Sequence, residues 1–160
     1  MTYIFEPPEI PTVAISREQS RFPVRRIFCV GRNYEAHARE MGVSSNRELP
    51  FFFTKPADAV VDSGMTIPYP TLTENFHYEA ELVVAIGREG FRIDENDVPN
   101  HIFGYAAGND LTRRDLQLMA RESGRPWDWG KAFDKSAPCA PIHRIEETGE
   151  MIEGRITLTL

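Results

Sequence analysis

The sequence predicts an α+β protein in which strands predominate. Several short apolar runs, rich in branched or aromatic side chains, are bounded by glycine, proline or polar residues, which is the pattern of buried strands. Two segments, residues 34–41 and 113–122, carry helix start and stop signals. The chain has 160 residues, of which 41% are hydrophobic, so it can bury one core and we expect one domain.

The expected strands follow from the apolar stretches that lie between turn residues. Proline limits one of them, because Pro68 and Pro70 confine the stretch before them to a sheet edge. The strands are expected at residues 12–15, 25–30, 51–56, 65–68, 80–87, 101–108 and 154–160. The last one alternates as a strand should and then stops, so we expect a chain that is incomplete at its C-terminal side.

The two expected helices have recognisable caps. Asn33 is a suitable N-cap for residues 34–41, because its side chain can accept a hydrogen bond from a free backbone N–H of the first turn. Thr112 is the expected cap of residues 113–122, with Asp115 in the first turn. A charged connection with one helical turn is expected between the strands that end at residue 87 and begin at residue 101.

The composition argues against several classes of partner. A net charge of −6, with both signs mixed along the chain, does not suit a nucleic-acid surface. No apolar run is long enough to cross a bilayer, and the first residues lack the basic and apolar regions of a signal peptide. Cys29 and Cys139 lie far apart without metal-binding neighbours, so we expect two reduced thiols in a cytoplasmic protein with no nucleic-acid or membrane partner.

Two glutamates stand out at the start of the strand expected at residues 80–87. Because strand side chains alternate, Glu79 and Glu81 point to the same face. Two carboxylates that enter a core repel each other and lose hydration unless a positive charge lies between them, and a divalent cation is the simplest such charge. The alternative is that both lie at the solvated mouth of the strand as ordinary surface charges.

Asp110 is the natural third partner of this pair. It follows the strand expected at residues 101–108, at a turn next to Gly108. Three carboxylates without histidine or cysteine define an oxygen-only site, which magnesium, manganese or calcium prefer over zinc. The alternative is that Asp110 simply ends the strand and caps the turn.

Other ionisable residues suggest acid–base chemistry. His37 and Glu40 are three apart on an expected helix, so the carboxylate can orient the imidazole as a base, although such pairs are commonly a solvated helix face. Lys55, Arg114 and Lys131 lie in segments around the acidic residues. They can bind an anionic substrate or stabilise an oxyanion, or they can simply balance the acidic charges.

A series of short motifs runs from about residue 25 to residue 142. It comprises Val30-Gly31-Arg32-Asn33-Tyr34 with His37 and Glu40, Phe53-Thr54-Lys55-Pro56, Tyr78-Glu79-Ala80-Glu81-Leu82, Gly104-Tyr105, Asn109-Asp110-Leu111-Thr112-Arg113-Arg114-Asp115-Leu116-Gln117 and Lys131-Ala132-Phe133-Asp134. In this order the motifs resemble the fumarylacetoacetate hydrolase family, and together they are far more specific than any one of them.

The resemblance implies a role for each matching position. It implies that Glu79, Glu81 and Asp110 bind Mg²⁺ or Mn²⁺, and that Ca²⁺ can replace it in crystals. It further implies that His37, paired with Glu40, activates the attacking water and that Lys131 stabilises the oxyanion. The implied substrate contacts are Lys55, Arg114 and Gln117. Gln117 is an alternative to Lys131 at the oxyanion.

The resemblance also implies a fold and an assembly. The family fold is a mixed β-sandwich roll with short helices, usually in a homodimer. We expect residues 1–24 to be an N-terminal arm and residues 25–160 to be the N-terminal portion of the catalytic domain. Relatives continue beyond the position of residue 160, so part of the sheet and one wall of the site are expected to be absent.

The implied activity is hydrolysis of a carbon–carbon bond in a 2,4-diketo acid. The proline-rich arm and the motifs Phe22-Pro23-Val24-Arg25-Arg26 and Gly124-Arg125-Pro126-Trp127 favour fumarylpyruvate, an intermediate of gentisate breakdown, as the substrate. The alternatives within the family are another acylpyruvate hydrolase, an oxaloacetate decarboxylase and a hydroxy-diene-dioate isomerase. An alternative of another class is a non-catalytic domain that binds a cation or ligand.

Overall fold

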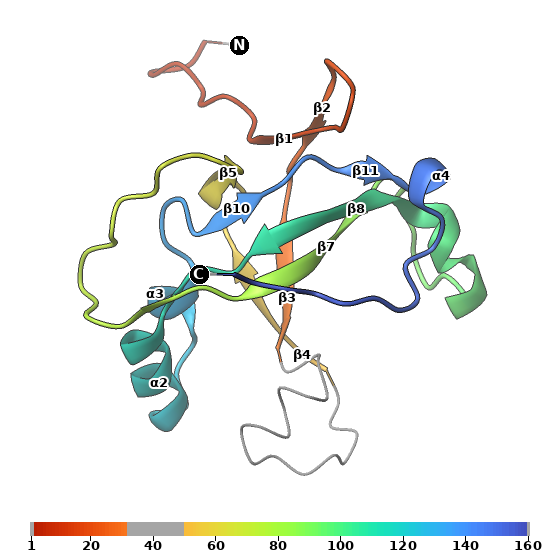
Figure 1. The fold of residues 1–160 in the computed structure, drawn as a ribbon. Helices are drawn as coiled ribbons and strands as arrows, with labels where there is room; N and C mark the ends of the chain where they lie inside the picture. Colours follow the sequence, from red (N-terminus) through yellow and green to blue (C-terminus); the bar gives the residue numbers. More distant parts are fainter. Residues whose placement is uncertain (1, 32–49, 160) are drawn as a thin grey trace.

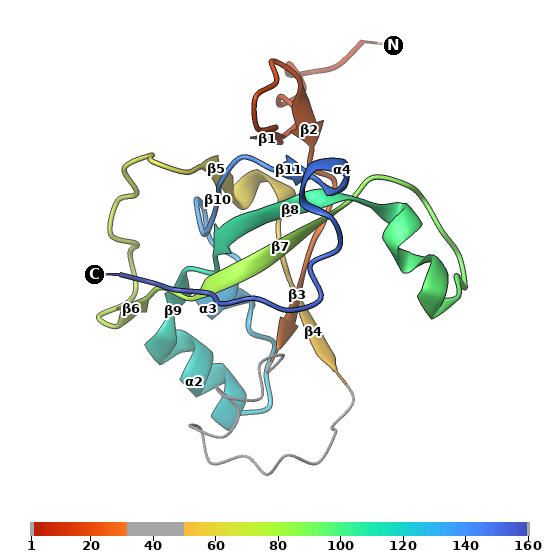
Figure 2. The same ribbon diagram turned by 45° about the vertical axis from the view of Figure 1, so that its right-hand side comes forward.

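The computed structural model describes residues 2–31 and 50–159, and within them strands predominate over short helices (Figures 1 and 2). The strands are β1 (Thr12–Ala14), β2 (Arg21–Pro23), β3 (Ile27–Gly31), β4 (Phe51–Lys55), β5 (Val60–Asp62), β6 (Phe76–His77), β7 (Ala80–Ile86), β8 (Ile102–Asn109), β9 (Thr112–Arg113), β10 (Ala137–Cys139) and β11 (His143–Arg144). The helices are α2 (Arg114–Glu122), α3 (Asp128–Lys131), α4 (Ile145–Thr148) and the 3-10 helices η1 (Ala57–Ala59) and η2 (Glu95–His101).

The central sheet is built on the antiparallel pair β7 and β8, which runs from Ala80 opposite Asn109 to Ile86 opposite Ile102. The other edge of β8 pairs with β10 and β11, and β10 continues to β5 in parallel. Gly104 permits the close approach of β11, because a Cβ there would lie 2.1 Å from the carbonyl oxygen of His143. The close backbone approach expected from the glycines of this strand is therefore confirmed.

The core lies between the central sheet and the N-terminal strand β1. Its buried members are Val13, Ala85, Ala106, Cys139 and Ile142. Since Val13 is only 4% exposed, part of the segment expected to be an arm packs into the body of the domain. The boundary between residues 24 and 25 stays a prediction.

The side chains of β7 alternate between the two faces of the sheet, as the sequence pattern predicts. Ala85 is buried and Glu81 is half-buried on the inner face. Leu82, Val84 and Ile86 point the other way and are exposed. The strand therefore directs Glu81 toward the interior.

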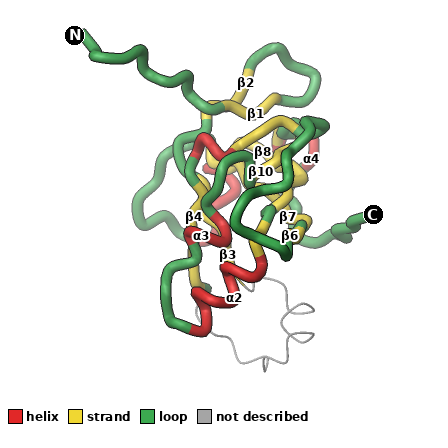
Figure 3. The backbone as a smooth tube through the Cα atoms, turned by 90° about the vertical axis from the view of Figure 1, so that its left-hand side faces the viewer, coloured by secondary structure: helices red, strands yellow, loops and turns green. Residues whose placement is uncertain are grey.

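Strands β3 and β4 form a separate antiparallel pair, with Ile27 opposite Lys55. This pair crosses the central sheet and runs toward α2 and α3, which lie beside each other at one end of the strands (Figures 2 and 3). The rings of Phe51 and Phe53 pack against Trp127, the residue before α3. Their centroids lie 4.9 Å and 5.6 Å, respectively, from the centroid of the Trp127 ring. This aromatic contact joins the β3–β4 pair to the helical end.

Some predicted elements differ from the structure. Residues 65–68 and 154–159 form no strand, because alternation creates a strand only where a neighbouring strand completes the backbone hydrogen bonds, and neither segment has a paired neighbour among the described residues. Residues 128–131 form the short helix α3, which no helix signal in the sequence predicted. The helix expected at residues 34–41 lies outside the described residues.

Helix α2 begins one residue later than predicted, and Thr112 is not its cap. The N-cap residue is Arg113, and no side chain makes a capping hydrogen bond there. The Thr112 hydroxyl instead donates to the carbonyl oxygen of Asp110 at 2.9 Å. The Thr112 side chain therefore bonds the preceding backbone and does not cap the helix.

Asp115 connects α2 to the loop before β6. Its carboxylate accepts hydrogen bonds from the Thr73 hydroxyl at 2.6 Å, the Glu74 amide at 3.0 Å and the Leu116 amide at 2.9 Å. The hydrogen bond from Thr73 is the main cause that lowers the pKa of Asp115 below its ordinary value of 3.8. The ionised form thus holds the loop against the helix.

We predict that Asp115→Asn lowers the free energy of unfolding at pH 7 by about 1 kcal/mol, since hydrogen bonds to a charged acceptor are lost. Because the folded pKa is depressed, this stabilisation is complete above pH 3.8 and disappears as the pH falls through the folded value. Urea denaturation at pH 7 and at pH 3 measures the difference. The difference in free energy of unfolding between the wild type and Asp115→Asn should be smaller at pH 3 than at pH 7. The control Asp134→Asn, at an exposed position, should differ little from the wild type at either pH.

Within the part of the chain that the structure describes, no helix is long and apolar enough to span a membrane.

Candidate active site

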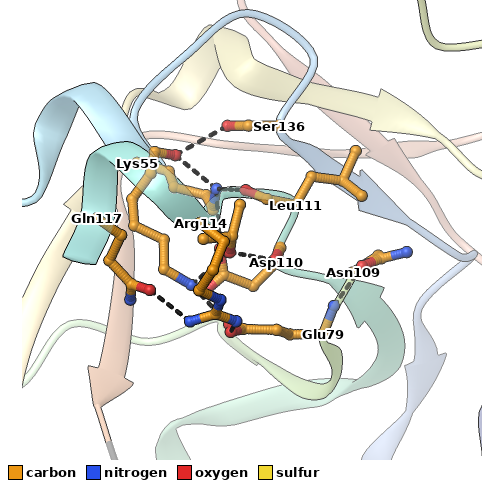
Figure 4. Close-up of polar contacts among 10 residues, drawn as sticks. Lys55, Glu79, Asn109, Asp110, Leu111, Arg114, Gln117 and Ser136 are labelled. Carbon is orange, nitrogen blue, oxygen red and sulfur yellow. Dashed lines mark hydrogen bonds and ion pairs between the residues drawn. The ribbon is translucent and has the colours of Figure 1, made fainter. Parts of the chain in front are cut away.

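A cluster of buried charges lies where β7 begins, β8 ends and α3 packs against them (Figure 4). At its centre is Lys131, which is 1% exposed. Its ammonium donates hydrogen bonds to Glu79 Oε2 at 2.5 Å, Asp110 Oδ2 at 2.6 Å and Thr112 Oγ1 at 2.7 Å. Lys131 therefore joins two of the predicted metal ligands.

The two carboxylates meet because β7 and β8 are antiparallel, so the start of one strand lies beside the end of the other. The backbone continues the pairing beyond the strands: the Asp110 amide donates to the Glu79 carbonyl at 2.8 Å. The Asn109 side chain accepts a hydrogen bond from the Glu79 amide at 3.0 Å. These contacts hold both acidic residues at one end of the sheet.

Lys131 reaches this end because α3 packs tightly against α2. Gly130 makes the contact possible, since a Cβ there would lie 2.8 Å from Cβ of Gln117. Glycine at this position thus lets the helix that carries Lys131 approach the carboxylates.

Arg114 holds the other oxygen of Glu79. Its guanidinium donates to Glu79 Oε1 and also to the side-chain oxygen of Gln117, which is buried. Burial raises the pKa of Glu79, but the charges and hydrogen bonds of Lys131 and Arg114 outweigh this, and the pKa is below its ordinary value. Glu79 is therefore held as a carboxylate with both oxygens bound.

Lys55 contacts the cluster from β4. It is 3% exposed, and its ammonium lies 2.9 Å from Asp110 Oδ1. It donates to the carbonyl oxygens of Leu111 at 3.0 Å and Lys131 at 2.5 Å. Burial is the main cause that lowers the pKa of Lys55, and Asp110 opposes the shift.

The structure assembles the predicted metal ligands in part. Glu79 and Asp110 converge on one ammonium, and Glu81 lies half-buried on the inner face of β7. In residues 2–31 and 50–159, however, no three or more His, Cys, Asp or Glu side chains are close enough together to hold a metal ion. The assignment of these three residues as ligands stays a prediction, as do the roles of His37 and Glu40, which lie outside the described residues.

The donor atoms present suit a hard cation. The converging groups are carboxylates, and oxygen ligands are those that magnesium and manganese prefer. Asp110 Oδ1 is buried and accepts no hydrogen bond from the described residues, although the Lys55 ammonium is at ion-pair distance. Its charge is paired with Lys55 in this structure, so a bound cation would share this oxygen with the lysine.

Sequence reasoning missed two neutral members of the cluster. Thr112 and Ser136 are fully buried, and the Ser136 hydroxyl donates to the Lys131 carbonyl at 3.1 Å. Thr112 was open to prediction, because it follows Asp110 by two residues and so shares its face in an extended chain. Ser136 gave no such signal.

Cys29 also faces the cluster. Burial raises the pKa of its thiol to about 11, and the charge of Asp110 adds to the effect. The thiol is therefore a neutral neighbour of the carboxylates at physiological pH.

The chain is similar to known proteins over most of its length. Residues 26–160 match the family model described as fumarylacetoacetate (FAA) hydrolase C-terminal. Over 117 residues the chain is 52% identical to the fumarylpyruvate hydrolase of Ralstonia sp., covering 72% of this chain and 60% of that protein. Over 140 residues it is 37% identical to oxaloacetate tautomerase YcgM of Escherichia coli, covering 87% of this chain and 64% of that protein.

A solved structure has the same fold. The fumarylpyruvate hydrolase of Pseudomonas aeruginosa, crystallised with Mn²⁺ and pyruvate, superposes with a TM-score of 0.87 at 52% identity over 92% of this chain and 65% of that one. The expected α+β, mostly β fold of the family is thereby confirmed. The chain spans about two thirds or less of the length of these relatives. The match to the family model over residues 26–160 shows that the chain belongs to the fumarylacetoacetate hydrolase family.

Proposed function

We propose that the protein hydrolyses a carbon–carbon bond in a 2,4-diketo acid, and that its substrate is fumarylpyruvate, cleaved to fumarate and pyruvate during the breakdown of aromatic compounds. The observation that carries the proposal is the convergence of Glu79 and Asp110 on Lys131 in a buried cluster. The similarity to fumarylpyruvate hydrolases supports the choice of substrate.

A divalent cation, Mg²⁺ or Mn²⁺, is part of this proposal. Glu79, Glu81 and Asp110 would hold it, in keeping with the Mn²⁺ in the related crystal structure. When bound, the cation supplies positive charge that polarises the oxygens of the substrate and stabilises the charge that develops during cleavage.

The chain's own residues provide the remaining steps. His37, oriented by Glu40, takes a proton from water, which attacks the distal ketone carbon. Lys131, whose ammonium would be released from Glu79 and Asp110 when these carboxylates hold the cation, or Gln117 donates a hydrogen bond to the resulting oxyanion. The carbon–carbon bond then breaks, its electron pair leaves with the pyruvate portion, and a proton completes that product. Arg114, which already holds Glu79, is proposed to bind the substrate from the same side.

The proposal is tested by an assay of fumarylpyruvate hydrolysis, which is monitored by the ultraviolet absorbance of the enol form of the substrate. We predict turnover with Mn²⁺ or Mg²⁺, its loss after treatment with EDTA, and its recovery when Mn²⁺ is added. The variant His37→Ala should still bind Mn²⁺ but lose at least about 100-fold in turnover. Hydrolysis that EDTA leaves unchanged would contradict the cation's role.

Oxaloacetate is a second candidate substrate, because oxaloacetate tautomerases are among the relatives. Assays with fumarylpyruvate, other acylpyruvates and oxaloacetate distinguish hydrolysis from tautomerisation, decarboxylation or isomerisation. A chain that binds Mn²⁺ and turns over none of these would instead be a binding domain.

We propose further that the protein is a cytoplasmic homodimer. Cys29 and Cys139 are free thiols in the structure, which agrees with a reducing compartment. The homodimer follows the usual assembly of the family.

A further inference from the structure

The ammonium of Lys55 is occupied by protein atoms. An ammonium has three hydrogens, and three oxygens lie within 3.0 Å of this one: Asp110 Oδ1 and the carbonyl oxygens of Leu111 and Lys131. With Lys55 only 3% exposed, little of it remains for a substrate to contact.

The three oxygens belong to two parts of the fold, and Lys55 itself to a third. Asp110 and Leu111 follow β8, Lys131 ends α3, and Lys55 itself ends β4. One side chain thus connects three segments that are up to 76 residues apart in sequence, at the point where they form the charge cluster (Figure 4). The same Lys131 carbonyl also accepts the hydroxyl hydrogen of Ser136.

Lys55 thus contacts two groups at the proposed cation site, the Asp110 carboxylate and the backbone of Lys131. The Asp110 carboxylate is held between two ammonium groups, with Oδ1 toward Lys55 and Oδ2 toward Lys131. The backbone of Lys131 is held by Lys55 while its side chain bonds Glu79 and Asp110. Removal of the Lys55 ammonium would leave Asp110 Oδ1 without its ion-pair partner and would remove one of the hydrogen bonds that the Lys131 carbonyl accepts.

We propose that Lys55 is a positioning residue, which orients the Asp110 carboxylate and the backbone at Lys131, in place of the substrate contact that the family resemblance implies. The inference rests on the proposed function, because it assigns Asp110 to the cation. Groups that orient a metal ligand from behind typically contribute 10- to 100-fold to metal affinity.

The test compares Lys55→Met, which keeps the length of the side chain but loses its charge, with the wild-type chain. Mn²⁺ affinity is measured by electron paramagnetic resonance of the free ion, and circular dichroism checks the fold. We expect Mn²⁺ binding about 10- to 100-fold weaker in Lys55→Met. The control Lys135→Met makes the same change at an exposed lysine and should bind within about twofold of the wild type.

Lys55→Arg covers the case in which Lys55→Met does not fold. It keeps the charge, but a planar guanidinium cannot direct hydrogens to the same three oxygens, so Mn²⁺ affinity should again fall. At saturating Mn²⁺, we expect kcat to fall with KM little changed, whereas a substrate ligand would raise KM.

Mn²⁺ affinity within about twofold of wild type in a folded Lys55 variant would overturn the inference and leave the proposed function intact. A wild-type chain that binds no Mn²⁺ would instead overturn the proposed function, and the role of Lys55 in orienting a cation ligand with it.

Discussion

Asp110→Asn is expected to abolish Mn²⁺ binding and to lower the free energy of unfolding by about 3 to 5 kcal/mol, the usual cost of removing one partner of a buried ion pair. Asp110 is 8% exposed and lies between the ammonium groups of Lys55 and Lys131, at 2.9 and 2.6 Å. An amide of the same shape would leave these two buried cations without their shared anion.

Urea denaturation without metal and calorimetric titration with Mn²⁺ measure the two effects. The matched control is Asp62→Asn, which removes a carboxylate from the exposed ion pair with Arg21, whose length of 2.8 Å lies between those of the two Asp110 pairs. Exposed pairs contribute about 1 kcal/mol or less, so this variant should remain stable and bind Mn²⁺ normally. If Asp110→Asn is as stable as the control and binds Mn²⁺ as the control does, Asp110 is neither a cation ligand nor the shared partner of the two lysines.

Lys131→Met is expected to reduce turnover by about 100- to 1000-fold, the loss seen when an oxyanion donor is removed. Its effect on stability should depend on metal. Without metal, Glu79 and Asp110 lose their shared ammonium, and we expect the free energy of unfolding to fall by about 3 to 5 kcal/mol. Mn²⁺ should restore part of the loss, because the cation neutralises the same carboxylates and binds only the folded state.

Thermal unfolding with and without Mn²⁺ checks this prediction, with Lys135→Met as the control of equal chemistry at an exposed position. The contrast with Asp110→Asn is informative, since Mn²⁺ should stabilise Lys131→Met and not Asp110→Asn. Turnover near the wild-type rate in Lys131→Met would exclude this lysine as the oxyanion donor.

Sequence patterns predicted five of the eleven strands among the described residues, β1, β3, β4, β7 and β8, and the motifs predicted the family. The alternation of residues 80–87 predicted β7 and the inward direction of Glu81, because the side-chain period of a strand is a local property of the backbone. The ordered motifs predicted the family, which the match over residues 26–160 confirms. By contrast, the local pattern of residues 154–159 predicted a strand that has no paired neighbour among the described residues.

The pairing of the charges, by contrast, depends on how distant segments pack. The sequence pattern placed Lys55, Arg114 and Lys131 around three acids but did not indicate which cation pairs with which acid. The structure places Lys131 between Glu79 and Asp110 and directs Lys55 at the far oxygen of Asp110. These partners are 21 to 55 residues apart, and their pairing follows from the packing of β4, β8 and α3, since a buried charge must find its counter-charge wherever the fold brings one.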